Sequence, residues 1–189
     1  EYMKAAAKTV KRGKWGMFCI PGVANLDHVR LAADQGMGFI RIGTDIDKVD
    51  DGIPFIELAR KLGIEVFANF IKSYVLKPSE FAKLVSYIAD FGAEIVYLVD
   101  SAGGMLPSEV REFVNAASNN APNVPLGFHG HNNLGLAMAN SIVCLEEGVA
   151  MIDTSLQGFG RSAGNTPTEQ LISTMIRLGY VTEIDPVKA

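Results

Sequence analysis

The chain has 189 residues, 48% of them hydrophobic, and a formal net charge of −4. That length suffices to bury the core of one domain, and the lack of a basic excess excludes a general attraction to nucleic acid or to an anionic membrane. No apolar run approaches the ~18 residues that span a bilayer, and no signal peptide is visible. Two cysteines in apolar stretches, Cys19 and Cys144, indicate buried thiols of a reducing compartment, the cytoplasm.

A repeating unit runs along the chain: a short apolar strand, a loop rich in Gly, Asp, Ser or Asn, and an amphipathic helix. Several strand candidates are near-continuous apolar runs, which are typical of parallel strands covered on both faces. We expect strands at residues 16–20, 38–42, 65–70, 94–99, 126–129 and 151–155.

The helices between these strands have recognisable starts and stops. A proline followed by Ser or Thr and then Glu opens three of them, and a glycine closes most. We expect helices over 26–35 with Asn25 as cap, from Pro54 to Gly63, from Pro78 to Gly92, from Pro107 onward, over 134–147, and from Pro167 to near Gly179. Residues 1–8 resemble the middle of a helix, so we expect the chain to be a piece of a longer protein.

Six strand–helix units in series predict a parallel sheet with right-handed crossovers. An open doubly wound sheet and a (β/α)8 barrel both satisfy that pattern. No G-x-G-x-x-G follows the first strand, whereas polar residues follow many different strands, which favours the barrel. Those residues are Thr44, Asp45, Asn69, Asp100, Ser101, His129, His131, Asp153 and Asn165. The chain supplies about six of the eight units that a barrel needs.

His129-Gly130-His131 is the most informative stretch, because it ends an apolar strand. Alternate residues of a strand project to the same face, so both imidazoles point the same way and suit a divalent metal. The alternative is a pair of surface histidines in a loop. In the glycine-rich loop 158–165, Asn165 is a candidate oxygen donor to that metal, although by itself it would be assigned as a helix cap.

Three further polar residues have two interpretations each. Ser101, after Asp100, either holds a carboxylate or carbonyl of a substrate or belongs to a polar turn that caps the next helix. Arg41, inside a strand, favours an ion pair within the barrel, with anion binding as the alternative. Asp153 either orients a metal-bound imidazole or caps a loop.

Five stretches together resemble the 4-hydroxy-2-oxovalerate aldolase branch of the HMG-CoA-lyase-like (DRE-type metallolyase) barrels. The first is Gly127-Phe128-His129-Gly130-His131-Asn132-Asn133-Leu134-Gly135, which continues to Ser141; the others are residues 151–156, residues 160–169, and Ile20-Pro21-Gly22 with residues 99–104. The likeness covers nearly the whole chain.

The resemblance implies one partial (β/α)8 barrel domain over residues 1–189, with the six strands as the third to eighth. It implies a divalent metal, Mn²⁺ first and Mg²⁺ or Co²⁺ next, held by His129, His131 and Asn165, with Ser101 positioning a 2-keto acid. The implied reaction is that of a carbon–carbon lyase of aromatic catabolism. It cleaves a 4-hydroxy-2-oxo acid to pyruvate and an aldehyde through a metal-stabilised enolate.

Two segments of that branch have no counterpart in the sequence: the first strand with its metal-binding Asp and catalytic Arg, and the C-terminal region that docks an aldehyde dehydrogenase. We therefore expect a chain that is incomplete for catalysis by itself. An unclosed sheet edge predicts association with another chain. The alternatives are an acyl-CoA-dependent Claisen-type synthase, an HMG-CoA-lyase-like enzyme, or a non-catalytic metal-binding remnant or assembly module.

Overall fold

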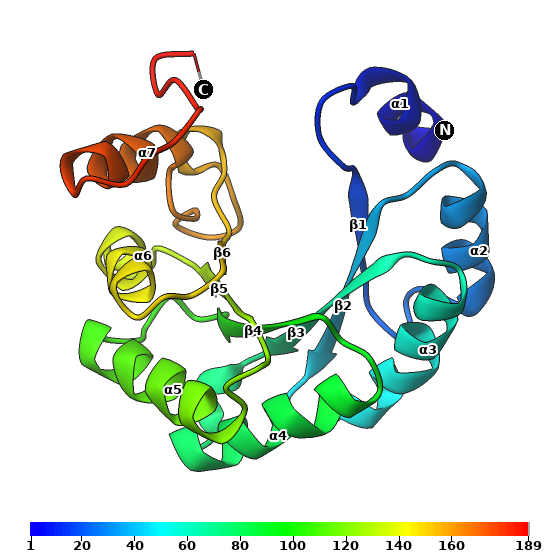
Figure 1. Ribbon diagram of the computed structural model, residues 1–189, viewed down its shortest axis with the longest axis horizontal. Coiled ribbons are helices and arrows are strands. Elements are labelled where there is room, and N and C mark those ends of the chain that lie inside the picture. Colours follow the sequence, from blue (N-terminus) through cyan, green and yellow to red (C-terminus); the bar gives the residue numbers. More distant parts are fainter. Residues whose placement is uncertain (189) are drawn as a thin grey trace.

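The computed structural model describes residues 1–188, in which six parallel strands form one curved sheet with helices along its outer side (Figure 1). Each strand pairs with the next one along the chain, in the order β1-β2-β3-β4-β5-β6. A doubly wound sheet reverses its strand order at a switch point, so this order confirms the barrel-type arrangement. The strands are β1 (Gly16–Cys19), β2 (Phe39–Asp45), β3 (Glu65–Ile71), β4 (Ile95–Asp100), β5 (Leu126–Gly130) and β6 (Met151–Ile152).

The predicted helices are confirmed to within a few residues at their ends. They are α1 (Tyr2–Thr9), α2 (Leu26–Asp34), α3 (Ile53–Lys61), α4 (Pro78–Asp90), α5 (Pro107–Asn120), α6 (Ala137–Glu146) and α7 (Thr168–Arg177). The Asn25 cap is also confirmed, since its Oδ1 accepts the backbone N–H of His28 at 3.1 Å. Three short 3₁₀ helices lie in the loops and were not predicted: η1 (Val49–Gly52), η2 (Ser73–Val75) and η3 (Leu156–Gly158).

The glutamates of the Pro-Ser-Glu starts satisfy backbone N–H groups that a helix leaves unpaired at its first turn. Glu80 accepts from the backbone of Lys77 at 3.0 Å, and Glu109 accepts from the backbone of Leu106 at 2.7 Å. The sequence motif is therefore a capping device with a specific hydrogen bond behind it.

Glu109→Ala should lower the free energy of unfolding by about 1 kcal/mol, because it leaves the Leu106 N–H without its acceptor and removes a negative charge from the start of α5. Glu112→Ala, one turn further on the exposed side of the same helix, should change stability by less than about 0.5 kcal/mol. Urea unfolding of both variants measures the difference. Equal effects would show that the hydrogen bond does not stabilise the helix.

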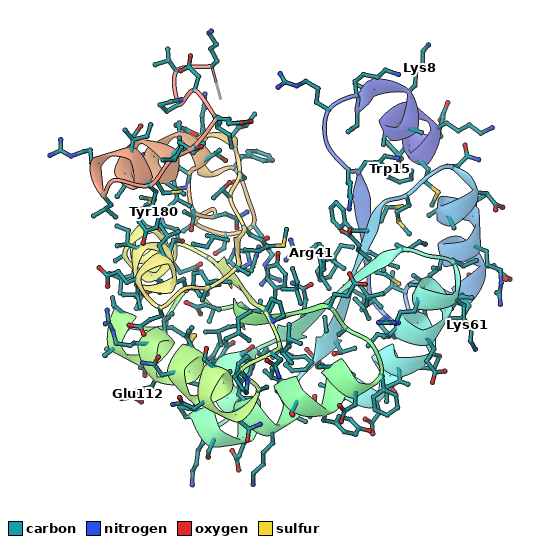
Figure 2. All side chains as sticks on the ribbon, in the orientation of Figure 1. Lys8, Trp15, Arg41, Lys61, Glu112 and Tyr180 are labelled. Atoms are coloured by element: carbon teal, nitrogen blue, oxygen red, sulfur yellow. The ribbon has the colours of Figure 1, made fainter. Side chains whose placement is uncertain are left out.

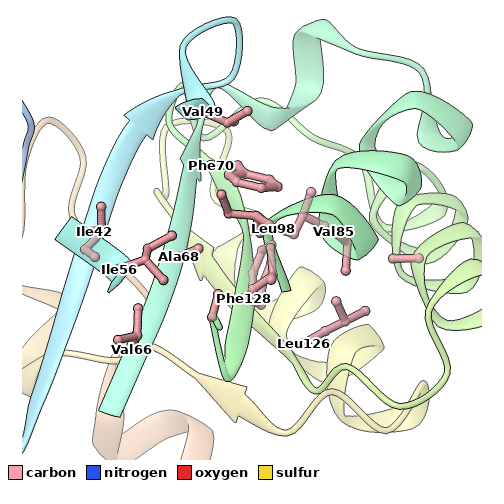
Figure 3. Packing of buried hydrophobic residues seen from close by; sticks show 14 of the residues in the cluster. Ile42, Val49, Ile56, Val66, Ala68, Phe70, Val85, Leu98, Leu126 and Phe128 are labelled. Carbon is pink, nitrogen blue, oxygen red and sulfur yellow. The ribbon is translucent and has the colours of Figure 1, made fainter. Parts of the chain in front are cut away.

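The main core lies between the outer face of the sheet and the helices (Figure 3). Phe81 of α4 is fully buried, and its ring meets Phe70 of β3 edge-on at 6.0 Å and Phe113 of α5 at 5.5 Å. Phe128 of β5 is buried to the same extent. The two ring contacts of Phe81 join one strand and two helices, so α4 and α5 are held on the sheet by a shared apolar layer.

The concave face of the sheet carries the alternate residues of each strand. On this face Phe67, Tyr97 and Val99 form a second apolar cluster. Gly127, the partner of Tyr97 in β5, leaves room for that ring, because a Cβ there would lie 2.5 Å from it. Polar residues lie level with this cluster on the neighbouring strands, because the register pairs Arg41 with Phe67, Asn69 with Tyr97 and His129 with Val99.

Three predicted boundaries are wrong. The strand expected at 38–42 continues to Asp45, because it stays paired with β3 as far as Ile71. The strand expected at 151–155 ends at Ile152, because the N–H of Ser155 bonds to Thr166 near α7 and not to β5. The helix expected from residue 134 begins at Ala137, because Gly135 has a φ of 72° and forms a turn that the side chain of Asn132 closes onto the N–H of Ala137.

Both cysteines are buried free thiols, as predicted, and burial raises the pKa of Cys19 to about 11. A thiol with that pKa is protonated near neutral pH and is a poor nucleophile. Within residues 1–188, no helix is both long and apolar enough to cross a bilayer.

Candidate metal and substrate site

The two histidines lie together at the carboxyl end of β5. His129 is in the strand and His131 follows it, with ring centroids 5.0 Å apart and planes at 83° to each other. Both rings line one cavity of about 300 Å³ on the concave side of the sheet. The prediction that they project the same way is confirmed, and their distance is compatible with a shared ligand between them.

Asp153 holds the first of these imidazoles. It follows β6, and its Oδ2 lies 2.8 Å from Nδ1 of His129. A carboxylate in that position fixes the ring and presents its other nitrogen to the cavity. Burial by itself raises the pKa of Asp153, but the hydrogen bond to His129 and the charge of Arg41 outweigh it, so the net pKa lies below its ordinary value.

Arg41 lies in the middle of the concave side (Figure 2) and forms an ion pair with the same carboxylate, Asp153. Its Nε also donates to Oδ1 of Asn69 at 3.3 Å, and its guanidinium lies 4.3 Å from the centroid of the Tyr97 ring. The predicted ion pair inside the barrel is confirmed. Only a fifth of the Arg41 side chain is exposed, so its charge depends on this partner.

The sequence left two roles open for the loop after β4, a polar turn and a substrate contact, and the structure is compatible with both. The buried carboxylate of Asp100 accepts the N–H groups of Gly104 and Met105 at 3.1 and 3.0 Å, which is a polar turn, although it does not cap α5. Ser101 lines the cavity, and its Oγ accepts the N–H of Lys72 at 2.9 Å. That bond uses an acceptor site, so the Ser101 proton stays available to an oxygen in the cavity.

Asn165 lies beside His131, because the two residues form an isolated antiparallel bridge. The Asn132 N–H donates to the carbonyl of Gly164 at 2.9 Å and joins the same two segments. The amide Nδ2 of Asn165 donates to the Phe159 carbonyl at 3.4 Å. Within residues 1–188, Oδ1 of Asn165 and Nδ1 of His131 are buried without a hydrogen-bond partner.

An oxygen and a nitrogen left unpaired on adjacent residues fit a cation better than an apolar ligand, because buried polar atoms otherwise find partners. Burial, the neighbouring His129 and Arg161 lower the pKa of His131, which favours the neutral ring that a metal requires. No group of three His, Cys, Asp or Glu side chains that could hold a metal occurs within residues 1–188. The candidate donors are the two imidazoles, which line the cavity, and the amide oxygen of Asn165, which lies beside His131 but is not among the residues that line the cavity.

Two residues of this region were not recognised in the sequence. Tyr97 is hidden in a continuous apolar run, yet it supports Arg41; burial and the charge of Asp153 raise its pKa. Arg161 belongs to the glycine-rich loop and lines the cavity next to Ser101, whose backbone carbonyl it contacts. The available signal for Arg161 was an arginine among glycines after a strand, whereas Tyr97 had no such signal.

These features define an incomplete (β/α)8 barrel whose candidate metal ligands stand at the carboxyl ends of its strands. The profile of the HMGL-like family matches residues 24–188. The chain therefore belongs to the HMGL-like family.

Several curated relatives carry the name 4-hydroxy-2-oxovalerate aldolase. One from Geobacillus genomosp. 3 is 40% identical over 185 residues, which cover 98% of this chain and 55% of the relative. One from Pseudomonas putida is 36% identical over 191 residues, with 100% and 55% covered. The chain thus spans about half the length of the curated relatives it matches.

Solved structures show the same fold. The HMG-CoA lyase of Brucella melitensis superposes with a TM-score of 0.84 at 20% identity, covering 98% of this chain and 74% of the lyase chain. Rhizobium etli pyruvate carboxylase superposes with a TM-score of 0.87 at 16% identity, over 98% of this chain and 19% of the other. At these identities the likeness concerns the fold alone.

Proposed function

We propose that the protein containing this chain cleaves a 4-hydroxy-2-oxo acid to pyruvate and an aldehyde, as a divalent-metal-dependent carbon–carbon lyase. The name of the relatives supports the reaction, and one observation carries the site: His129 and His131 line a single cavity while Asp153 holds the first of them. In this reaction a base takes the proton of the 4-hydroxyl as the C3–C4 bond breaks and the aldehyde forms. The electron pair of that bond passes to the enolate of pyruvate, and a proton returned to C3 completes pyruvate.

His129, His131 and Asn165 would hold the cation, Mn²⁺ first and Mg²⁺ or Co²⁺ next, because neutral nitrogen and oxygen donors suit these ions. When bound, such an ion supplies Lewis-acid stabilisation of negative charge on the keto oxygen. Asp153 keeps His129 in one orientation, and the ion pair with Arg41 keeps Asp153 ionised and in place.

Ser101 would position the keto acid. The Lys72 N–H holds the Oγ of Ser101 in place, so the hydroxyl can donate its proton to the substrate without a further loss of side-chain freedom. The cavity of about 300 Å³ has the size of a small-molecule site and suits a five-carbon acid. The dehydrogenase partner, the oligomer and the cytoplasmic location stay predictions.

His129→Ala and His131→Ala should each weaken Mn²⁺ binding by at least about 10- to 100-fold, the loss known for residues that merely support a ligand. His28→Ala is the matched control, since His28 lies on α2, outside the residues that line the cavity. Titration of free Mn²⁺ by electron paramagnetic resonance measures the affinity. Unchanged binding in both cavity variants would remove the proposed metal site.

The reaction itself is tested by pyruvate release from 4-hydroxy-2-oxopentanoate, in the complete protein that contains this chain and with Mn²⁺ present. Reduction of pyruvate by lactate dehydrogenase gives the readout. Product formation from acetyl-CoA and a 2-keto acid, with no aldol cleavage, would select a synthase instead. Metal binding without either turnover would identify a non-catalytic module.

A further inference from the structure

The cations around the cavity differ in whether a carboxylate neutralises them. Arg41 pairs with Asp153, and Lys72, whose N–H meets Ser101, pairs with Asp45 at 3.1 Å. Within residues 1–188, Arg161 forms no ion pair, and none of the residues that line the cavity is acidic. The cavity therefore presents one uncompensated guanidinium to whatever enters it.

The side chain of Arg161 is anchored at one point. Its Nη2 donates to the backbone carbonyl of Ser101 at 3.1 Å, which joins the loop after β6 to the end of β4. A single bond to a neutral carbonyl leaves the other donors of the guanidinium fork for a ligand.

The backbone around Arg161 is held in a particular shape. Ser162 has a φ of 60°, a left-handed conformation that is unusual for a residue with a side chain, and its Oγ accepts from Asn133 Nδ2 at 2.7 Å. The N–H of Gly164 returns to the carbonyl of Arg161 at 3.1 Å. This closed turn presents the arginine in place before a ligand arrives.

We infer that Arg161 binds the carboxylate of the substrate and makes the cavity selective for 2-oxo acid anions over their neutral analogues. This inference rests on the proposed function for the identity of the substrate. A planar guanidinium matches a carboxylate with two parallel hydrogen bonds, and Ser101 lies at its side to take a further oxygen. Arg161 is then a specificity residue, while the two histidines would hold the cation.

Binding of pyruvate and of methyl pyruvate by titration calorimetry, with Mn²⁺ and after chelator treatment, tests the inference. Arg161→Gln should weaken pyruvate binding by about 10- to 100-fold, the loss expected for a charge-assisted hydrogen bond, and leave methyl pyruvate unchanged. Arg161→Lys should retain part of the affinity. Arg30→Gln, an exposed arginine on α2 outside the cavity, should bind like the parent protein.

Equal pyruvate affinity in the parent and Arg161→Gln would overturn the inference, as would absence of pyruvate binding by the parent or equal losses for the acid and its ester. The thermal midpoint of Arg161→Gln should match that of the parent, because the side chain is exposed. Arginine-dependent pyruvate binding without aldol cleavage would refute the proposed function alone. Aldol cleavage with an unchanged KM in Arg161→Gln would refute this inference alone.

Discussion

Asp153→Ala should destabilise the protein by about 3–5 kcal/mol, the cost of leaving a buried charge without its partner. Arg41 and Asp153 are only 20% and 16% exposed, so the guanidinium of the variant would recover only part of the hydration that it has in water. His129 would lose at the same time the one side-chain hydrogen-bond partner that it has within residues 1–188, and we expect Mn²⁺ affinity to fall about 10- to 100-fold. Urea unfolding and Mn²⁺ titration measure the two effects.

A double variant separates the ion pair from general damage. Arg41→Met with Asp153→Leu removes both charges and should be less destabilised than Asp153→Ala alone, because no unpaired charge remains. Asp27→Asn is the exposed control, since Asp27 pairs with Arg30 on α2 with 87% of its side chain exposed, and it should cost less than about 0.5 kcal/mol. A loss below about 1 kcal/mol in Asp153→Ala would contradict the structural role assigned here.

Phe81→Ala should lower the free energy of unfolding by about 3–5 kcal/mol, the usual cost of emptying an aromatic site in a core. The ring is fully buried and contacts Phe70 of β3 and Phe113 of α5. The space left by the ring could close only if these elements moved relative to α4. Chemical unfolding monitored by circular dichroism gives the value, provided that the variant still folds.

Two companion variants keep this prediction decisive. Phe81→Leu retains most of the apolar volume and should lose clearly less than Phe81→Ala. Phe159→Ala removes a ring that is 87% exposed and should leave stability within about 0.5 kcal/mol of the parent. Similar losses at Phe81 and Phe159 would mean that the aromatic layer does not carry the stability of the fold.

The number and type of the elements could be predicted because local signals suffice for them. The apolar run at 95–99 became β4, and the Pro-Ser-Glu starts became helix N-termini, where the structure adds the hydrogen bonds of the two glutamates. The choice of barrel over doubly wound sheet followed from polar residues at many strand ends. The signals for single strands and helices lie within a few residues of each other, so contacts with distant segments did not alter these elements.

Other features depend on contacts between distant segments and could not be predicted. The end of β6 is decided by the loop before α7, which takes the hydrogen bonds of Ser155. The position of Arg161 depends on the left-handed turn at Ser162 and on a carbonyl 60 residues earlier. The pair His129 and His131 was predicted from strand alternation, whereas the ion pair at Arg41 could be anticipated only as a need for some partner, which proved to be Asp153.

Asp153 touches groups from opposite parts of the arc: Arg41 from β2 and His129 from β5. A carboxylate that contacts both strands links distant parts of the concave face. A flatter sheet would separate Asp153 from Arg41 or from His129, and the His129 ring would then lose its fixed orientation. The nuclear magnetic resonance chemical shift of the His129 ring should therefore change when substitutions far from the site alter the curvature of the sheet.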